Sequence, residues 1–186
     1  MARTRKATSK RAHAARKIGN GSKSKSEKFR TLEDLFKHEL KDMYTGEHLL
    51  LEALKELESE STDSELAQAF SRHREETMGH IERLETVGEL IGEELEEEEC
   101  PGIEGLIKEK ETFMEHKPVE ELVQIFNIGA GQKSERYEIT AYEGLIELGG
   151  KLGLNEAVRE LRATLTEEEA ALKKLKTLGQ RMPVPA

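Results

Sequence analysis

Tryptophan is absent from the 186-residue sequence, cysteine occurs once, and aromatic residues make up only 4% of the chain. A single cysteine, Cys100, excludes an intramolecular disulfide, and the acidic run beside it offers nothing that would activate its thiolate. No apolar run approaches the roughly 18 residues that a membrane-spanning helix needs, and no apolar segment follows the basic N-terminus as it would in a secretory signal. We therefore expect a cytoplasmic protein that has no contact with a membrane.

Charged residues, in contrast, are abundant. They make up 36% of the chain, beside 35% hydrophobic residues, which suffice for one domain with a hydrophobic core. This composition is typical of long helices with solvated outer faces rather than of a sheet. The sequence predicts an all-α domain over residues 29–180, a basic tail over residues 1–28 and a short C-terminal tail over residues 181–186.

The charges divide between a basic N-terminal segment and an acidic remainder. Residues 1–30 hold eleven lysines and arginines and one acid, Glu27, so they carry +10 and the other 156 residues carry −19. A Ser-, Gly- and Lys-rich segment cannot compensate its ordering entropy by burial, so we expect residues 1–28 to be disordered. Without aromatic residues for base stacking, this tail permits only nonspecific contact with nucleic acid phosphates or with an acidic protein surface. A passive solubilising role and a targeting role are the alternatives.

Capping signals and helical periodicity divide the remainder into four long helices and a short one. The expected ranges are 31–60, a second helix capped at Thr62 or Asp63 and ending near 93, 103–116, 118–150 and 155–179. Only two or three residues link the first two helices, so these should form an antiparallel pair. The last two long helices should form a second pair, because several glycines near residue 150 interrupt the pattern. The sequence thus predicts a ferritin-like four-helix bundle with a crossover connection that contains the short extra helix.

Polar residues occupy the middle of the apolar stripe of every long helix. They are Glu47 in the first helix, His73, Glu76 or Thr77, and His80 in the second, Glu135 and Glu138 in the third, and Glu168 in the fourth. In the third helix we expect Leu122, Ile125 and Ile128 to begin the stripe. Glu47 and Glu76 each lie about 14 residues from the turn between them, or roughly 21 Å at about 1.5 Å per residue. Glu135 and Glu168 are likewise equidistant from theirs, so the carboxylates should form one layer.

A layer of buried carboxylates without compensation is unstable, because isolated burial costs several kcal/mol per ion. Two cations, bridged by carboxylates and completed by imidazole, would satisfy both the charge and the geometry, and oxygen and imidazole ligands suit Fe and Mn. The expected ligands of two Fe or Mn ions are Glu47, His73, Glu76, His80, Glu135, Glu138 and Glu168. The choice between the two histidines stays open at this point. The alternative is that some of these side chains rotate outward into solvent. Tyr44 and Tyr142, one turn from Glu47 and Glu138, either hydrogen-bond these carboxylates or are ordinary core residues.

Four segments resemble the YciE/YciF-type family of ferritin-like bacterial stress proteins: TLEDLFKHELKDMYTGEHLLLEAL, AFSRHREETMGHIERLE, QKSERYEITAYEGL and LRATLTEEEAALKKL. The resemblance covers residues 31–178 and implies a bundle that forms a homodimer, a dinuclear metal centre and a role in stress response. The chain departs from the general ferritin-like plan at Gly79 and at Ala171, where that plan places histidines. We expect two ions held asymmetrically, the second of them by oxygen ligands alone, so that one site binds more tightly than the other.

Two functions are compatible with these features. The first is a dinuclear Fe or Mn stress protein that oxidises Fe(II) or consumes peroxide, with no catalytic residue beyond the metal ligands. The second is a noncatalytic bundle in which a structural metal or a polar network joins the helices, while residues 1–28 attach it to DNA or to a partner.

Overall fold

The structure is a computed structural model that describes residues 29–183. This part of the chain contains five helices: α1 (Leu32–Glu60), α2 (Ser64–Ile91), α3 (Pro101–Glu115), α4 (Glu120–Leu152) and α5 (Asn155–Arg181). The all-α prediction is confirmed, and the helix bounds agree with the expected ones within about two residues. The expected tail over residues 1–28 lies outside the described residues, as do residues 184–186. The expected homodimer stays a prediction.

Local sequence signals determine where the helices begin and end. Thr31 and Asp34 form a capping box at the start of α1, and the side chain of Asp63 accepts a hydrogen bond from the backbone of Leu66 at the start of α2. Gly92 and Gly153 end α2 and α4 in the left-handed conformation, with φ of 69° and 74°, which glycine adopts without steric cost. These caps fix the lengths of the helices that carry the polar layer.

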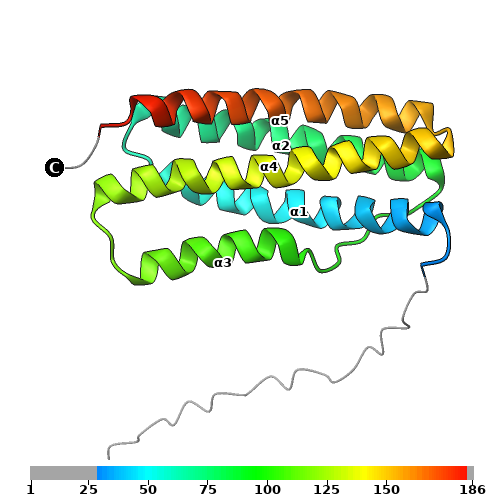
Figure 1. The fold of residues 1–186 in the computed structure, drawn as a ribbon, viewed down its shortest axis with the longest axis horizontal. Helices are drawn as coiled ribbons and strands as arrows, with labels where there is room; N and C mark the ends of the chain where they lie inside the picture. Colours follow the sequence, from blue (N-terminus) through cyan, green and yellow to red (C-terminus); the bar gives the residue numbers. More distant parts are fainter. Residues whose placement is uncertain (1–28, 184–186) are drawn as a thin grey trace, which may run out of the picture.

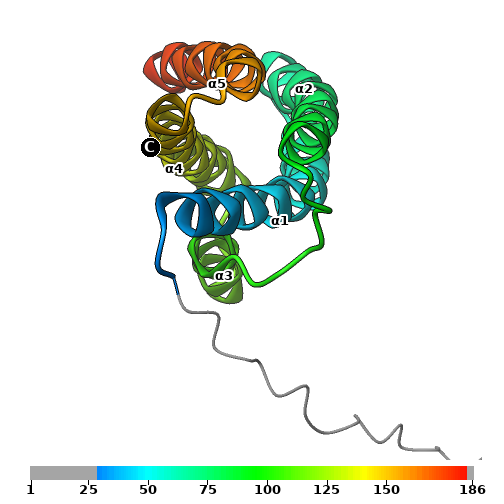
Figure 2. The ribbon, with the colours of Figure 1, turned by 90° about the vertical axis from the view of Figure 1, so that its right-hand side faces the viewer.

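The four long helices form a closed bundle. α1 pairs with α2 and α4 pairs with α5, and the two pairs meet along α2 with α5 and α1 with α4 (Figures 1 and 2). The short helix α3 lies outside the bundle against α1 and α4, within the crossover that joins the two pairs. The predicted four-helix bundle with a short extra helix in its crossover is therefore confirmed. In the described part of the chain, every helix is too short or too polar to cross a membrane.

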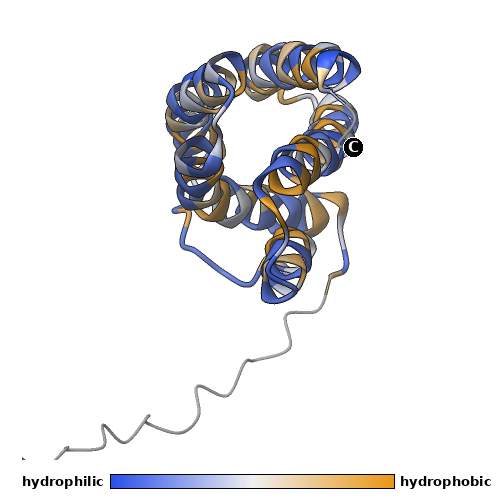
Figure 3. Cartoon of the chain, turned by 90° about the vertical axis from the view of Figure 1, so that its left-hand side faces the viewer, coloured by the Kyte–Doolittle hydropathy of each residue, from blue (hydrophilic) through white to orange (hydrophobic). Residues whose placement is uncertain are grey.

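Two apolar clusters fill the bundle. One lies toward the start of α1 and includes Phe36, Leu84 and Leu161; the other lies toward its end and includes Leu66, Phe70 and Leu175. Polar and apolar segments alternate along every helix, as expected for amphipathic helices with solvated outer faces (Figure 3). Between the two clusters, at mid-length of the long helices, lies the layer of polar side chains.

Candidate metal centre

Six of the seven predicted ligands lie buried in one layer. They are Glu47 on α1, His73 and His80 on α2, Glu135 and Glu138 on α4, and Glu168 on α5, all at most 5% exposed. Each long helix thus contributes at least one carboxylate or imidazole, as the stripe positions predicted. The structure also answers the question of which histidine points inward, because both do.

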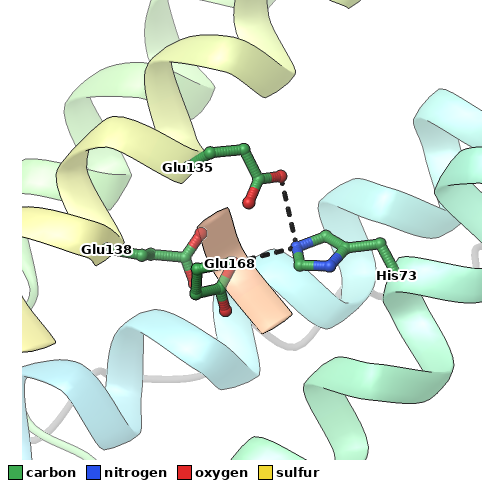
Figure 4. A group of neighbouring side chains, drawn as sticks. All are labelled: His73, Glu135, Glu138 and Glu168. Atoms are coloured by element: carbon green, nitrogen blue, oxygen red, sulfur yellow. Dashed lines mark ion pairs between the residues drawn. The ribbon is translucent and has the colours of Figure 1, made fainter. Parts of the chain in front are cut away.

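The first group of side chains comprises His73, Glu135, Glu138 and Glu168, whose potential ligand atoms lie within 4.8 Å of one another. Nε2 of His73 lies 3.2 Å from Oε1 of Glu135 and 3.5 Å from Oε2 of Glu168. Figure 4 shows the three carboxylates and the imidazole converging from three helices on one point. One nitrogen and three carboxylates are a suitable donor set for Fe or Mn.

The second group comprises Glu47, His80 and Glu168, again with potential ligand atoms within 4.8 Å of one another. Nδ1 of His80 lies 2.8 Å from Oε1 of Glu168 and 3.5 Å from Oε1 of Glu47. Each group contains one imidazole, so neither consists of oxygen ligands alone, in contrast to what was expected for the second ion. Glu168 belongs to both groups, and its two oxygens face different histidines. A carboxylate in this position can bridge two metal ions.

Many polar atoms of this layer lack a hydrogen-bond partner within residues 29–183. The unpartnered, fully buried oxygens are Oε2 of Glu47, Oε2 of Glu135 and both oxygens of Glu138 and of Glu168. An unsatisfied buried acceptor costs about 1–3 kcal/mol, and more when it is charged. Oxygens left without donors and aimed at a common centre therefore fit coordination to a cation.

The pKa values within the layer are strongly shifted. Burial, together with Glu168 and other nearby carboxylates, raises the pKa of Glu135 and of Glu138 well above the ordinary value. Burial also opposes the ionisation of Glu168, yet the close contact with His80, at 2.8 Å, and the charge of His73 lower its pKa to about 2. Burial by itself lowers the pKa of His80, but Glu168 and Glu47 overcome this effect and raise the pKa to about 10. Metal ions would replace the protons that Glu135, Glu138 and His80 otherwise hold.

Two supporting contacts were not predicted from the sequence. Nε2 of His80 lies 3.0 Å from Oε2 of Glu167, and Arg83 binds both oxygens of Glu167 at 2.7 and 3.0 Å. The only sequence signal for this arrangement is that Arg83 follows His80 by three residues and so shares its helix face. On the other side of the layer the Tyr142 hydroxyl donates a hydrogen bond to Glu47. Of the two roles left open for Tyr142, the structure shows the contact with a carboxylate.

Glu76 lies outside both groups in the described chain. Thr77 takes the core position at 1% exposure, whereas the Glu76 side chain is 23% exposed at the edge of the bundle. Its Oε2 lies 3.6 Å from Nδ1 of His73, and its Oε1 accepts a hydrogen bond of 2.8 Å from Nε of Arg72. His73 beside it lowers the pKa of Glu76, as does Arg72. Of the seven predicted ligands, Glu76 is thus the one that lies outside the buried layer, on the solvent side of the His73 ring.

Known proteins match the chain over the whole bundle. A family model described as a domain of unknown function (DUF892) matches residues 31–182, which include α1 to α5. Protein YciF of Escherichia coli (strain K12) is 39% identical over 151 residues, which cover 81% of this chain and 91% of that protein. The solved structure of YcfI from Rhodopseudomonas palustris has a TM-score of 0.79 and 36% identity, covering 82% of this chain and 97% of the other. The crystal structure of the E. coli stress protein YciF has a TM-score of 0.77 and 38% identity, covering 81% of this chain and 96% of the other.

Proposed function

The chain belongs to the DUF892 family, in agreement with its resemblance to the YciE/YciF-type proteins. We propose that it is a stress protein that binds two Fe or Mn ions and that either oxidises Fe(II) or consumes peroxide. The role in stress is supported by the description of E. coli YciF as a stress protein. The metal chemistry is supported by the polar layer of this chain itself.

One observation carries the proposal. Glu168 is 0% exposed, and its two oxygens face His73 at 3.5 Å and His80 at 2.8 Å, so that it joins two groups of potential ligands. Neighbouring carboxylates without hydrogen-bond donors are costly in a core that serves stability alone. A shared carboxylate with one imidazole on each side is an arrangement that suits a pair of cations.

The residues of the layer have separate tasks. His73, Glu135 and Glu138 would hold one ion, Glu47 and His80 the other, and Glu168 would bridge them. Tyr142 fixes the orientation of Glu47, while the apolar clusters close the two ends of the layer. When bound, such an ion pair supplies a redox couple that reacts with O2 or H2O2.

A small oxidant has a path to this layer. A cavity of about 1050 Å³ lies between α1, α3 and α4, and its lining includes Leu50, Leu54 and Leu106 together with His73, Glu135 and Glu138. Its apolar walls suit a neutral molecule such as O2 or H2O2 better than a hydrated ion. This cavity supports turnover, whereas a purely structural metal needs no access.

The test compares the wild-type protein with Glu168→Gln, which keeps the shape of the side chain but removes its charge. We expect about two ions per wild-type chain by elemental analysis, consumption of Fe(II) or of peroxide, and loss of both properties in the variant. Glu169→Gln, at the exposed neighbouring position, is the matched control and should behave as wild type. Metal binding without any turnover would favour the noncatalytic bundle with a structural metal, and a wild-type chain that binds no metal would refute the dinuclear centre.

A further inference from the structure

A second, more polar cavity reaches the same layer from the opposite side of the bundle. It has a volume of about 650 Å³ and lies between α2 and α5. His73 and Glu135, both buried, belong to its lining together with the more exposed Arg72, Glu75 and Glu76. The cavity therefore connects the surface with two of the residues that we assign to the metal centre.

The walls of this cavity suit the passage of a cation. Besides Glu135, which holds a proton in the metal-free protein, three carboxylates line it (Glu65, Glu75 and Glu76) against two basic side chains (Arg72 and Lys174), so its formal charge is negative. A cavity with an excess of one charge attracts ions of the opposite sign and accelerates their association. On α5 the wall consists partly of Ala170 and Ala171, whose small side chains leave the space between the helices open.

Glu76 stands where an ion would pass from this cavity to the ligands. Its carboxylate lies between solvent and His73, with Oε2 3.6 Å from Nδ1 of that ring. Arg72, which is 78% exposed, holds the other oxygen at 2.8 Å. Farther inward, Nδ1 of His73 and Oε2 of Glu135 are buried and have no hydrogen-bond partner in the described chain, so the inner end of the path offers free ligand atoms.

We propose that the cavity between α2 and α5 is the entry route for divalent cations and that Glu76 is the carboxylate that captures an ion and passes it to His73 and Glu135. This inference rests on the proposed metal centre and adds a role for the one predicted ligand that lies outside it. The cavity beside α3 is the alternative route: carboxylates such as Glu52, Glu56 and Glu97 belong to its lining too, but its wall is mainly apolar and does not include Glu76. The two cavities thus separate ion entry from oxidant entry.

The test measures how fast Co2+ enters and leaves the metal-free protein, by stopped-flow absorbance for uptake and by chelator competition for release. Glu76→Gln removes the capturing charge, and Ala171→Leu narrows the path without changing any charge. For both variants we expect uptake and release to slow by about tenfold or more while affinity and the number of ions bound stay unchanged. In Glu76→Gln the cause is the loss of electrostatic steering, which typically contributes a factor in this range, and in Ala171→Leu it is the narrower path.

Two control variants make the same chemical changes at positions outside the cavity between α2 and α5. Glu89→Gln makes the same charge change at an exposed position of α2 outside the cavity, and Ala130→Leu makes the same steric change in the apolar cavity. Both should take up Co2+ at the wild-type rate. Circular dichroism melting verifies that each variant is folded.

The possible outcomes separate the entry route from the metal centre. If Glu76→Gln lowers affinity or the number of ions, Glu76 is a ligand or an orienting residue, and the capture role is overturned. Wild-type rates in Ala171→Leu, or slowing in Ala130→Leu alone, would overturn the route while the metal centre stands. A wild-type protein that binds no Co2+, Mn2+ or Fe2+ at equilibrium would refute the centre and the route together.

Discussion

Nε2 of His80 lies 3.0 Å from Oε2 of Glu167, so one nitrogen of the ring is held by a carboxylate outside the candidate ligand groups. The other nitrogen, Nδ1, consequently faces Glu168 and Glu47 inside the layer. Arg83 fixes Glu167 in turn through two hydrogen bonds. A carboxylate behind a metal-binding histidine sets the tautomer and the orientation of the ring, and this is the role we assign to Glu167.

Replacing Glu167 by alanine should therefore weaken metal binding without removing a ligand. We expect the affinity for Mn2+ to fall about 10- to 100-fold, the usual effect of removing such a supporting partner. Competition with a chelator of known affinity measures the change. Glu169→Ala, two residues along α5 and exposed, should keep wild-type affinity. Equal affinities in the two variants would show that Arg83 and Glu167 form only a surface ion pair.

Removal of the Tyr142 hydroxyl should lower the stability of the metal-free protein. It donates a hydrogen bond to the fully buried Glu47. Tyr142→Phe leaves this carboxylate without a donor, so we expect the free energy of unfolding of the metal-free protein to fall by about 1–3 kcal/mol in urea denaturation. The control is Tyr44→Phe, because Tyr44 donates instead to the more exposed Glu85. If the control variant lost as much stability as Tyr142→Phe, the hydrogen bond to Glu47 would not be the cause.

The pattern of the sequence was enough to find the bundle and most of the polar layer. Helical periodicity and the equal distances of Glu135 and Glu168 from the turn between them depend only on helix geometry, which α4 and α5 follow closely. At helix α2 the same geometry left Glu76 and Thr77 as alternatives, since consecutive residues differ by about 100° and both lie near the edge of the stripe. The structure buries Thr77 and leaves Glu76 at the edge.

The beginning of α4 shows why the sequence could not predict every buried position. Leu122 and Ile125 were expected in the core, yet they are 44% and 40% exposed, while Gln124 and Asn127 are buried. Both amides bind Glu60 at the end of α1, Gln124 at 2.7 Å through the backbone oxygen and Asn127 at 2.9 Å through the side chain. Local periodicity cannot indicate that a polar residue is buried when its hydrogen-bond partner lies 64 or 67 positions away in the sequence.

Replacing Glu138 should show that the polar layer serves metal binding at the expense of the stability of the metal-free protein. Neither of its oxygens has a hydrogen-bond partner in the described chain, and the residue is 1% exposed. Glu138→Leu fills a similar volume without a polar group, so we expect the metal-free protein to gain about 1–3 kcal/mol and to lose the stabilisation that Mn2+ gives the wild type. Thermal melts with Mn2+ and with a chelator test both effects, and Glu143→Leu, exposed on the same helix, is the control. A destabilised variant would mean that Glu138 has a favourable partner in the metal-free state.

The pH dependence of the metal-free protein follows from its shifted groups. Glu135 and Glu138 have pKa values well above their ordinary 4.5 because of burial and neighbouring carboxylates, so the folded state keeps protons that the unfolded chain releases above about pH 4.5. These groups therefore favour unfolding increasingly as pH rises. His80, with a pKa of about 10 in the fold against an ordinary 6.5, contributes stability that is lost as pH rises from 6.5 to 10. Glu168, with a pKa lowered to about 2, contributes stability that is lost only as pH falls below about 4.5.

We accordingly expect the melting temperature of the metal-free protein to fall between pH 5.5 and pH 8.5, and the increase caused by Mn2+ to grow over the same range. Metal binding displaces the protons of Glu135, Glu138 and His80, so it competes with fewer protons at high pH. Calorimetric melts at constant ionic strength, with Mn2+ and with a chelator, measure both trends. In Glu168→Gln the Mn2+ effect should vanish at every pH. A melting temperature of the metal-free protein that rises over this range would show that the buried carboxyl groups are already ionised in the fold, and the displacement of protons by metal would then be wrong.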